Sequence, residues 1–107
     1  MYPIRYIIGM YIIQKTDIFE KWFTKLRDTS GKGRILARLK RAELGNLGDN
    51  KALGEHLFEM RIACGPGYRL YFYRRDNVII VLTNGGDKST QEEDILKARQ
   101  ILKELGV

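Results

Sequence analysis

The sequence predicts a single α+β domain over residues 1–107, in which a small, mostly antiparallel four-stranded sheet carries an N-terminal helical hairpin and a C-terminal helix. Three observations predict this fold class. A length of 107 residues suits one hydrophobic core. A composition of 44% hydrophobic and 30% charged residues is typical of globular domains. Apolar residues recur with a period of two in some segments and of about 3.6 in others, in the order β-α-α-β-β-β-α.

The first half of the chain predicts a strand followed by two helices. Residues 10–15 (MYIIQK) are rich in β-branched and aromatic side chains, which favour a strand. Thr16 or Asp17 then caps the first helix, and the second follows a turn over residues 28–33, where Ser30 is the expected cap. Both helices show an apolar face at helical spacing. Its members are Phe19, Trp22, Phe23 and Leu26 in the first helix, and Ile35, Leu39 and Ala42 in the second.

Three strands are predicted in the second half. Residues 45–54 contain three glycines together with Asn and Asp, so we expect a loop there. Alternating or continuous apolar residues then indicate strands. These cover residues 56–64, 68–75 and 78–82. Turns are expected at 65–67 and 76–77, and residues 84–87 (NGGD) break the last strand.

A final helix is predicted from Ser89 onward, because Ser89 and Glu92 form a capping box in the string S-T-Q-E. Its apolar residues again follow helical spacing. The expected buried face consists of Ile95, Ala98, Leu102 and Leu105.

A cluster of charged residues on the central strands is the candidate site. Glu59 and Arg61 share a strand face, and Arg69 joins that face if the connecting loop has an odd number of residues. A three-residue loop over 65–67 satisfies this condition and pairs Ile62 with Leu70. Two arginines close together repel each other unless an anion or an acid lies between them. The alternative to a phosphate site is a surface network in which Glu59 and acids of the last helix pair with both arginines.

Lys88 belongs to the same candidate site. It lies where a strand ends and a helix begins, and the free backbone N–H groups of a helix start favour a phosphate.

The positive charge of the chain is concentrated in one stretch. The net charge is +6, and residues 21–41 alone carry +7. Arg34, Arg38 and Arg41 follow helical spacing and form a ridge beside the buried face of the second helix. Such a surface is typical of a protein that binds nucleic acid or an acidic protein, and the alternative is a solvated helix face.

Several classes of protein are excluded. Cys64 and His56 are the only residues of their kinds, so neither an internal disulfide nor a zinc site of nitrogen and sulfur ligands can form. No phosphate loop and no nucleophile elbow occur. No segment has the roughly 20 apolar residues of a membrane span, so we expect a cytoplasmic protein.

Three strings carry a resemblance to a known family: E-x-R-I at 59–62, G-P-G-Y-R-x-Y at 65–71 and G-G-D-K-S-x-Q-x-x-D-I at 85–95. Together they resemble the addiction-module killer proteins, which are HigB-like toxins of the RelE/ParE superfamily. The resemblance covers roughly residues 10–105 and agrees with the predicted order of elements. Typical relatives begin near Met10, so residues 1–9 resemble an N-terminal extension or an upstream start.

The resemblance implies a toxin of a type II toxin–antitoxin pair that cuts messenger RNA on the ribosome through the RNA's own 2′-hydroxyl, without metal or other cofactor. The implied partners are the ribosome, the messenger and a small helix-turn-helix antitoxin. Arg69 matches a phosphate-binding catalytic position of the family, and Arg61 matches a basic residue that RelE-type enzymes use on the preceding strand. Lys88 stands where such enzymes have an arginine, and Glu59 is the candidate base. The expected RNA- or ribosome-binding residues are Arg34, Arg38, Arg41 and Lys51.

Two other functions remain open. The first is a ParE-type inhibitor of DNA gyrase without nuclease activity, which would share the fold but has no need of a phosphate site. The second is an RNA-binding module without catalysis, in which aromatic side chains stack on bases. The candidates for stacking are Tyr68, Tyr71, Phe72 and Tyr73.

Overall fold

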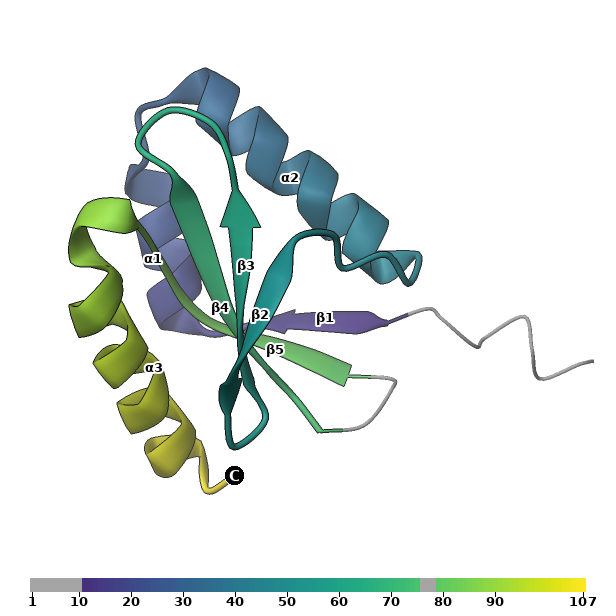
Figure 1. Cartoon of the computed structure of the whole chain (residues 1–107), viewed down its shortest axis with the longest axis vertical. Coiled ribbons are helices and arrows are strands. Elements are labelled where there is room, and N and C mark those ends of the chain that lie inside the picture. Colours follow the sequence, from purple (N-terminus) through teal and green to yellow (C-terminus); the bar gives the residue numbers. More distant parts are fainter. Residues whose placement is uncertain (1–10, 76–78) are drawn as a thin grey trace, which may run out of the picture.

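One five-stranded sheet forms the centre of the molecule, with helices on both of its faces (Figure 1). The structure, a computed structural model, describes residues 11–75 and 79–107. The elements are β1 (Ile12–Lys15), α1 (Asp17–Lys25), α2 (Thr29–Glu43), β2 (Asn50–Gly54), β3 (Leu57–Ile62), β4 (Tyr68–Arg74), β5 (Ile79–Asp87), a 3₁₀ turn η2 (Lys88–Thr90) and α3 (Gln91–Leu105).

The strand order β1-β5-β4-β3-β2 confirms a mostly antiparallel sheet, since only β1 and β5 run parallel. The predicted number of four strands is wrong. Residues 45–54 were expected to form a loop, but β2 occupies their second half and pairs with β3. Its glycine-rich sequence lacks the alternation of a strand, and the pairing shifts register between Ala52 and Gly54. Pairing with β3, rather than local propensity, therefore makes this segment a strand.

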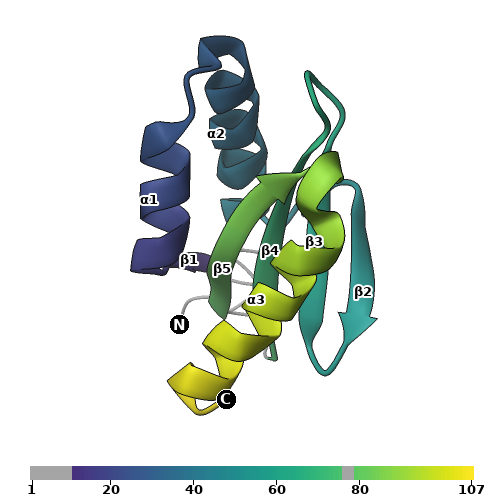
Figure 2. The same ribbon diagram turned by 90° about the vertical axis from the view of Figure 1, so that its left-hand side faces the viewer.

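Helices lie on both sides of the sheet (Figure 2), and each face carries its own hydrophobic core. Helices α1 and α2 cover one face, where Phe19, Ile35 and Leu39 pack against β3, β4 and β5. Helix α3 covers part of the other face, where Ala98 and Leu102 pack on Leu57 and Tyr71. Because α3 shields only part of this second face, charged side chains of β3 and β4 have room beside it.

The predicted helix faces are largely confirmed, but the helix starts differ. Thr16 caps α1 by accepting a hydrogen bond from Phe19 N (3.1 Å). Helix α2 begins at Thr29, so the turn expected over 28–33 and the cap expected at Ser30 are wrong. Asp28 is the cap, and its Oδ1 accepts from Gly31 N (3.0 Å). A carboxylate one residue before the first helical N–H groups satisfies them better than a serine inside the helix.

The start and the end of α3 also correct the prediction. The capping box of Ser89 and Glu92 does not form, because η2 precedes the helix and Asp87 accepts from Ser89 N (2.8 Å). Leu105, expected to be buried, is 52% exposed, while Ile101 is 5% exposed. The helix therefore turns a neighbouring stripe toward the sheet at its C-terminal end.

Strand β5 continues through Asp87, where a break after Leu82 was expected. An extra residue, Thr83, is accommodated as a bulge between the pairs Phe72–Leu82 and Tyr71–Asn84. The predicted turn at 76–77 and the suggested extension over residues 1–9 lie outside the described residues. Within the described part of the chain, no helix has the length and apolar character to cross a membrane.

Candidate functional site

The β3–β4 hairpin brings the charged residues of the candidate site together. Arg61 pairs directly with Arg69, and Ile62 pairs with Tyr68, so five residues form the loop. The expected three-residue loop and the expected Ile62–Leu70 pair are wrong. Their register differs from the observed one by two residues, and a shift by two keeps every side chain on its face. Glu59, Arg61 and Arg69 accordingly share one face of the sheet, as predicted from the odd loop length.

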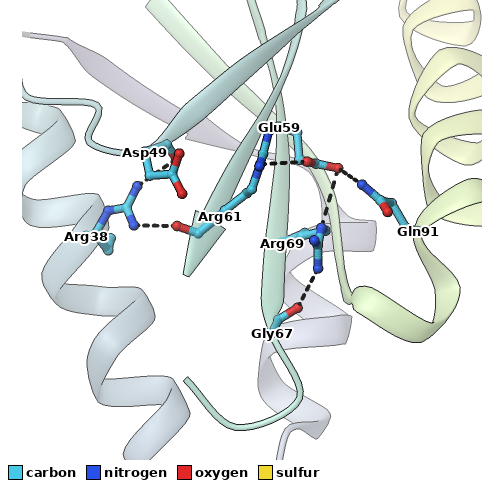
Figure 3. Close-up of polar contacts among 7 residues, drawn as sticks. All are labelled: Arg38, Asp49, Glu59, Arg61, Gly67, Arg69 and Gln91. Carbon is cyan, nitrogen blue, oxygen red and sulfur yellow. Dashed lines mark hydrogen bonds and ion pairs between the residues drawn. The ribbon is translucent and has the colours of Figure 1, made fainter. Parts of the chain in front are cut away.

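Glu59 lies between the two arginines and holds both of them (Figure 3). Its Oε1 is 3.2 Å from Nε of Arg61, and its Oε2 is 3.6 Å from Nε of Arg69. Gln91, in the first turn of α3, donates a hydrogen bond to Oε2 (2.8 Å). The Glu59 side chain is 1% exposed, against 14% for Arg69 and 40% for Arg61. The carboxylate is therefore a buried anchor for one partly exposed guanidinium group, that of Arg61, and one mostly buried group, that of Arg69.

This arrangement leaves an uncompensated positive charge facing solvent. Glu59 neutralises one of the two arginines, and the contacts through Nε are ion pairs rather than aligned hydrogen bonds. A second anion on the open side of the arginines would remove the remaining repulsion. Arg69 is further fixed by the hydrogen bond from its Nη1 to the Gly67 carbonyl (3.1 Å). The geometry suits a phosphate bound by guanidinium groups that are already in place.

The burial of Glu59 argues against the proton-accepting role predicted for it. Its two oxygens are engaged by Arg61, Arg69 and Gln91, and almost none of its surface reaches solvent. A general base must lie within hydrogen-bonding reach of the proton that it takes. Glu59 instead orients the arginines.

Lys88 lies beside Arg69, as its position in the sequence predicts. A methyl group placed on Gly67 would be 3.5 Å from Nη1 of Arg69 and 3.6 Å from Cβ of Lys88. Lys88 is exposed in η2, directly after β5. Its ammonium group can thus reach an anion bound at Arg69, whereas it lacks the planar fork of an arginine.

Arg38 has a structural role that the sequence did not predict. Its guanidinium donates to the carbonyls of Arg61 (2.5 Å), Leu47 (3.0 Å) and Asp49 (3.1 Å). Asp49 O also accepts from Arg61 N (2.9 Å), so Arg38 ties α2 and the loop before β2 to the strand that carries Arg61. Burial, followed by the nearby Arg41, lowers the pKa of this guanidinium. Hydrogen bonds to three backbone carbonyls occupy the half-buried Arg38 guanidinium, which argues against the expectation that it contacts RNA.

The other three expected RNA- or ribosome-binding residues are exposed. Arg34 and Arg41 lie on the outer side of α2 and line a groove of about 300 Å³ beside Ile62. Lys51 lies on β2 directly across from Glu59, at the edge of the charged face. Their side chains are available to a partner.

The aromatic residues considered for stacking are mostly in the core. Tyr68, Tyr71 and Phe72 are at most 4% exposed, and only Tyr73 is half-buried. The Tyr71 hydroxyl has no hydrogen-bond partner within the described residues, and burial together with the Glu59 carboxylate raises its pKa. These positions argue against a module that stacks bases on this hairpin.

Sequence reasoning missed Gln91, which completes the hydrogen bonding of Glu59. The sequence feature that could have indicated Gln91 is its position in the first turn of the last helix, three residues after Lys88. Only the path of β5 and η2 brings that turn over β3.

The comparisons with known proteins agree with this architecture. Among models of protein families, none matches this chain. An uncharacterised protein of Haemophilus influenzae is 43% identical over 95 residues, which are 89% of this chain and 96% of that protein. Among solved structures, an arginine-to-alanine double mutant of the E. coli toxin RelE in the free state has a similar fold, with a TM-score of 0.68 and 19% identity. That similarity covers 87% of this chain and 99% of the RelE chain.

Proposed function

This chain belongs to the same family as the uncharacterised Haemophilus influenzae protein and has the fold of RelE, and from these premises we propose that it is the toxin of a type II toxin–antitoxin pair. We propose further that it is an endoribonuclease of the HigB-like branch that cleaves messenger RNA on the ribosome. The observation that carries the proposal is the pair Arg61–Arg69, held on one face by buried Glu59.

The proposed reaction is attack of the RNA 2′-hydroxyl on the adjacent phosphorus. The 2′-hydroxyl loses its proton to solvent water as its oxygen bonds to phosphorus and the bond to the 5′ oxygen breaks. The departing 5′ oxygen takes up a proton, which leaves a 2′,3′-cyclic phosphate and a 5′-hydroxyl. Negative charge builds on the phosphorane in between, and fixed guanidinium groups stabilise it without reorganisation. Arg61 and Arg69 supply this stabilisation. Lys88 is proposed to bind the same phosphate and to give a proton to the departing 5′ oxygen.

Glu59 and Arg38 act as positioning residues in this proposal. Glu59 sets the direction of both guanidinium groups through their Nε atoms. Arg38 holds the backbone of Arg61 through its carbonyl. The exposed Arg34, Arg41 and Lys51 are proposed to dock on ribosomal RNA, and a small helix-turn-helix antitoxin is the proposed inhibitor.

Growth and messenger integrity after induction of wild-type and Arg69→Ala proteins test the proposal. We expect the wild type to arrest growth and to produce messengers with 2′,3′-cyclic phosphate ends, and Arg69→Ala to do neither at the same protein level. Arg75→Ala is a matched control, because Arg75 is exposed and follows the last residue of β4, away from the arginine pair. Arrest by Arg69→Ala would contradict the nuclease assignment. DNA damage as the first effect of the wild type would instead indicate a gyrase inhibitor.

A further inference from the structure

A second basic groove lies between α1 and α3, along the outer edge of β5. Its volume is about 540 Å³, which is in the range of pockets that take a small ligand. The floor is Gly85 and Gly86, and the walls are Trp22 of α1 and Asp94 of α3. Figure 2 shows the second half of β5 between these two helices. Three exposed lysines of the two helices also line the groove, namely Lys21, Lys25 and Lys97.

The two glycines allow the walls to approach the strand. A side chain on Gly85 would meet the Trp22 ring, and one on Gly86 would meet the Asp94 carboxylate. Both glycines are buried, because Trp22 and Asp94 close over them. The two walls thus stand close against the strand at Gly85 and Gly86.

The charge of the groove favours an anion. Three lysine side chains face two carboxylates, and Asp87 already caps η2 through Ser89. Burial raises the pKa of Asp94, although the hydrogen bond from Thr90 (2.6 Å) and the charge of Lys97 lower it. Thr90 thus holds the Asp94 carboxylate at the wall, and the three lysines of the groove outnumber its two carboxylates.

The groove adjoins the arginine site. Gly86 is the direct partner of Arg69 across β4 and β5, and Lys88 follows the strand two residues later. The groove therefore starts one strand away from Arg69, at Gly86, which the Asp94 carboxylate covers. Lysines beside an aromatic wall are the combination that binds single-stranded nucleic acid.

We infer that this groove binds the nucleotide of single-stranded RNA next to the scissile phosphate, with the lysines on its phosphate and its base against Trp22. The inference rests on the proposed function, since it extends the RNA path from the same site.

Trp22 provides a direct probe, because it is the only tryptophan of the chain. We propose titration with a fluorescein-labelled 2′-O-methyl RNA hexamer, whose blocked hydroxyl prevents cleavage. Anisotropy gives the affinity, and an unlabelled hexamer is used to follow Trp22 emission and its quenching by acrylamide. We expect the RNA to protect Trp22 from acrylamide.

The matched variants are Lys21→Glu/Lys97→Glu, in the groove, and Lys40→Glu/Lys103→Glu, which make the same change of charge elsewhere. We expect the groove variant to weaken binding at least tenfold and to lower the log–log salt slope by about 1.4, at about 0.7 for each lost phosphate contact. The control variant is expected to stay within about threefold of the wild type.

Two results would overturn the inference. One is RNA binding that leaves Trp22 unprotected or affects both variants equally. The other is equal protection of Trp22 by a hexaglutamate peptide, which would make the groove a site for acidic peptides. Either result, combined with loss of messenger cleavage in Arg69→Ala, would leave the proposed function intact. A wild type that binds the hexamer in the groove but cleaves no messenger would contradict the proposed function alone.

Discussion

The arginines of the sheet and those of α2 are held in different ways. On the sheet, buried Glu59 fixes Arg61 and Arg69 through their Nε atoms and leaves the ends of the guanidinium groups for an anion. On α2, Arg34 and Arg41 are exposed, whereas Arg38 between them is bound to backbone carbonyls. A rigid arginine can stabilise charge in a transition state, and a solvated one contributes mainly to docking. The regularly spaced arginines of α2 therefore have two different roles, and neither is the role of the sheet arginines.

The largest effect is expected from Glu59→Ala. This change leaves Arg61 and Arg69 opposite each other without a counter-ion and Gln91 without its acceptor. Breaking a buried charge network typically costs about 3–5 kcal/mol of unfolding free energy. Since Arg61 is 40% exposed and screened by solvent, we expect about 2–4 kcal/mol in urea unfolding. Glu93→Ala, on an exposed face of α3, should cost less than about 0.5 kcal/mol. Equal stability of the two variants would show that Glu59 anchors nothing.

Arg38→Ala tests the difference within α2. It removes donors to three carbonyls, and we expect a loss of about 2–3 kcal/mol in unfolding free energy. Arg34→Ala on the same helix is the control and should change stability by about 0.5 kcal/mol or less. Arg38→Lys should recover only part of the loss, because an ammonium group cannot span carbonyls on β3 and the preceding loop. If Arg38→Ala had the unfolding free energy of the wild type, Arg38 would be a solvated residue like Arg34.

A smaller effect is expected from the contact that joins α2 to β4. Tyr68 donates a hydrogen bond to Asp28 Oδ2 (2.8 Å). The hydrogen bonds from Gly31 N and from Tyr68 lower the pKa of Asp28, and the bond to Asp28 raises the pKa of Tyr68 to about 12.

The stability lost in Tyr68→Phe should therefore depend on pH in both directions. A lowered carboxyl pKa gives stability above about pH 3.8 that is lost as pH falls through the lower folded value. A raised phenol pKa gives stability below pH 10 that is lost as pH rises toward 12. The difference in urea midpoint between wild type and Tyr68→Phe should be largest at pH 5–9, while Tyr73→Phe should show little difference at any pH. A difference in urea midpoint that stays constant with pH would show that the Tyr68–Asp28 hydrogen bond is not coupled to the ionisation of either residue.

The sequence predicts the helices and strands whose apolar residues recur with a regular period. It does not predict an element that forms only because it pairs with a neighbouring strand. The apolar stripes of α1 and α2 and the shared face of Glu59, Arg61 and Arg69 follow from periods of 3.6 and two. Strand β2 could not be predicted, because its own residues favour a loop and β3 supplies its partner. The predicted length of the β3–β4 loop was also wrong. Its number of residues is nevertheless odd, as predicted, and this was sufficient to put Arg69 on the same face as Glu59 and Arg61.

The candidate site divides in the same way. Residues near in sequence, such as Glu59 and Arg61, were placed together correctly. Gln91, Asp94 and the anchoring of Arg38 depend on how α3 and α2 lie against the sheet, which no local pattern encodes. A side chain's role as an anchor or as a free charge is decided by these long-range contacts.

The central claim is that Arg61 and Arg69 act on one phosphate as a unit, and a double-mutant cycle tests it most directly. Single-turnover cleavage of messenger on purified ribosomes would be measured for Arg61→Ala, Arg69→Ala and the double variant. We expect each single change to slow cleavage by about 10²–10³-fold. The fold decrease in the double variant is expected to be at least about tenfold smaller than the product of the two single fold decreases. Rates that multiply without coupling, or a single change without effect, would show that the two arginines do not share a phosphate.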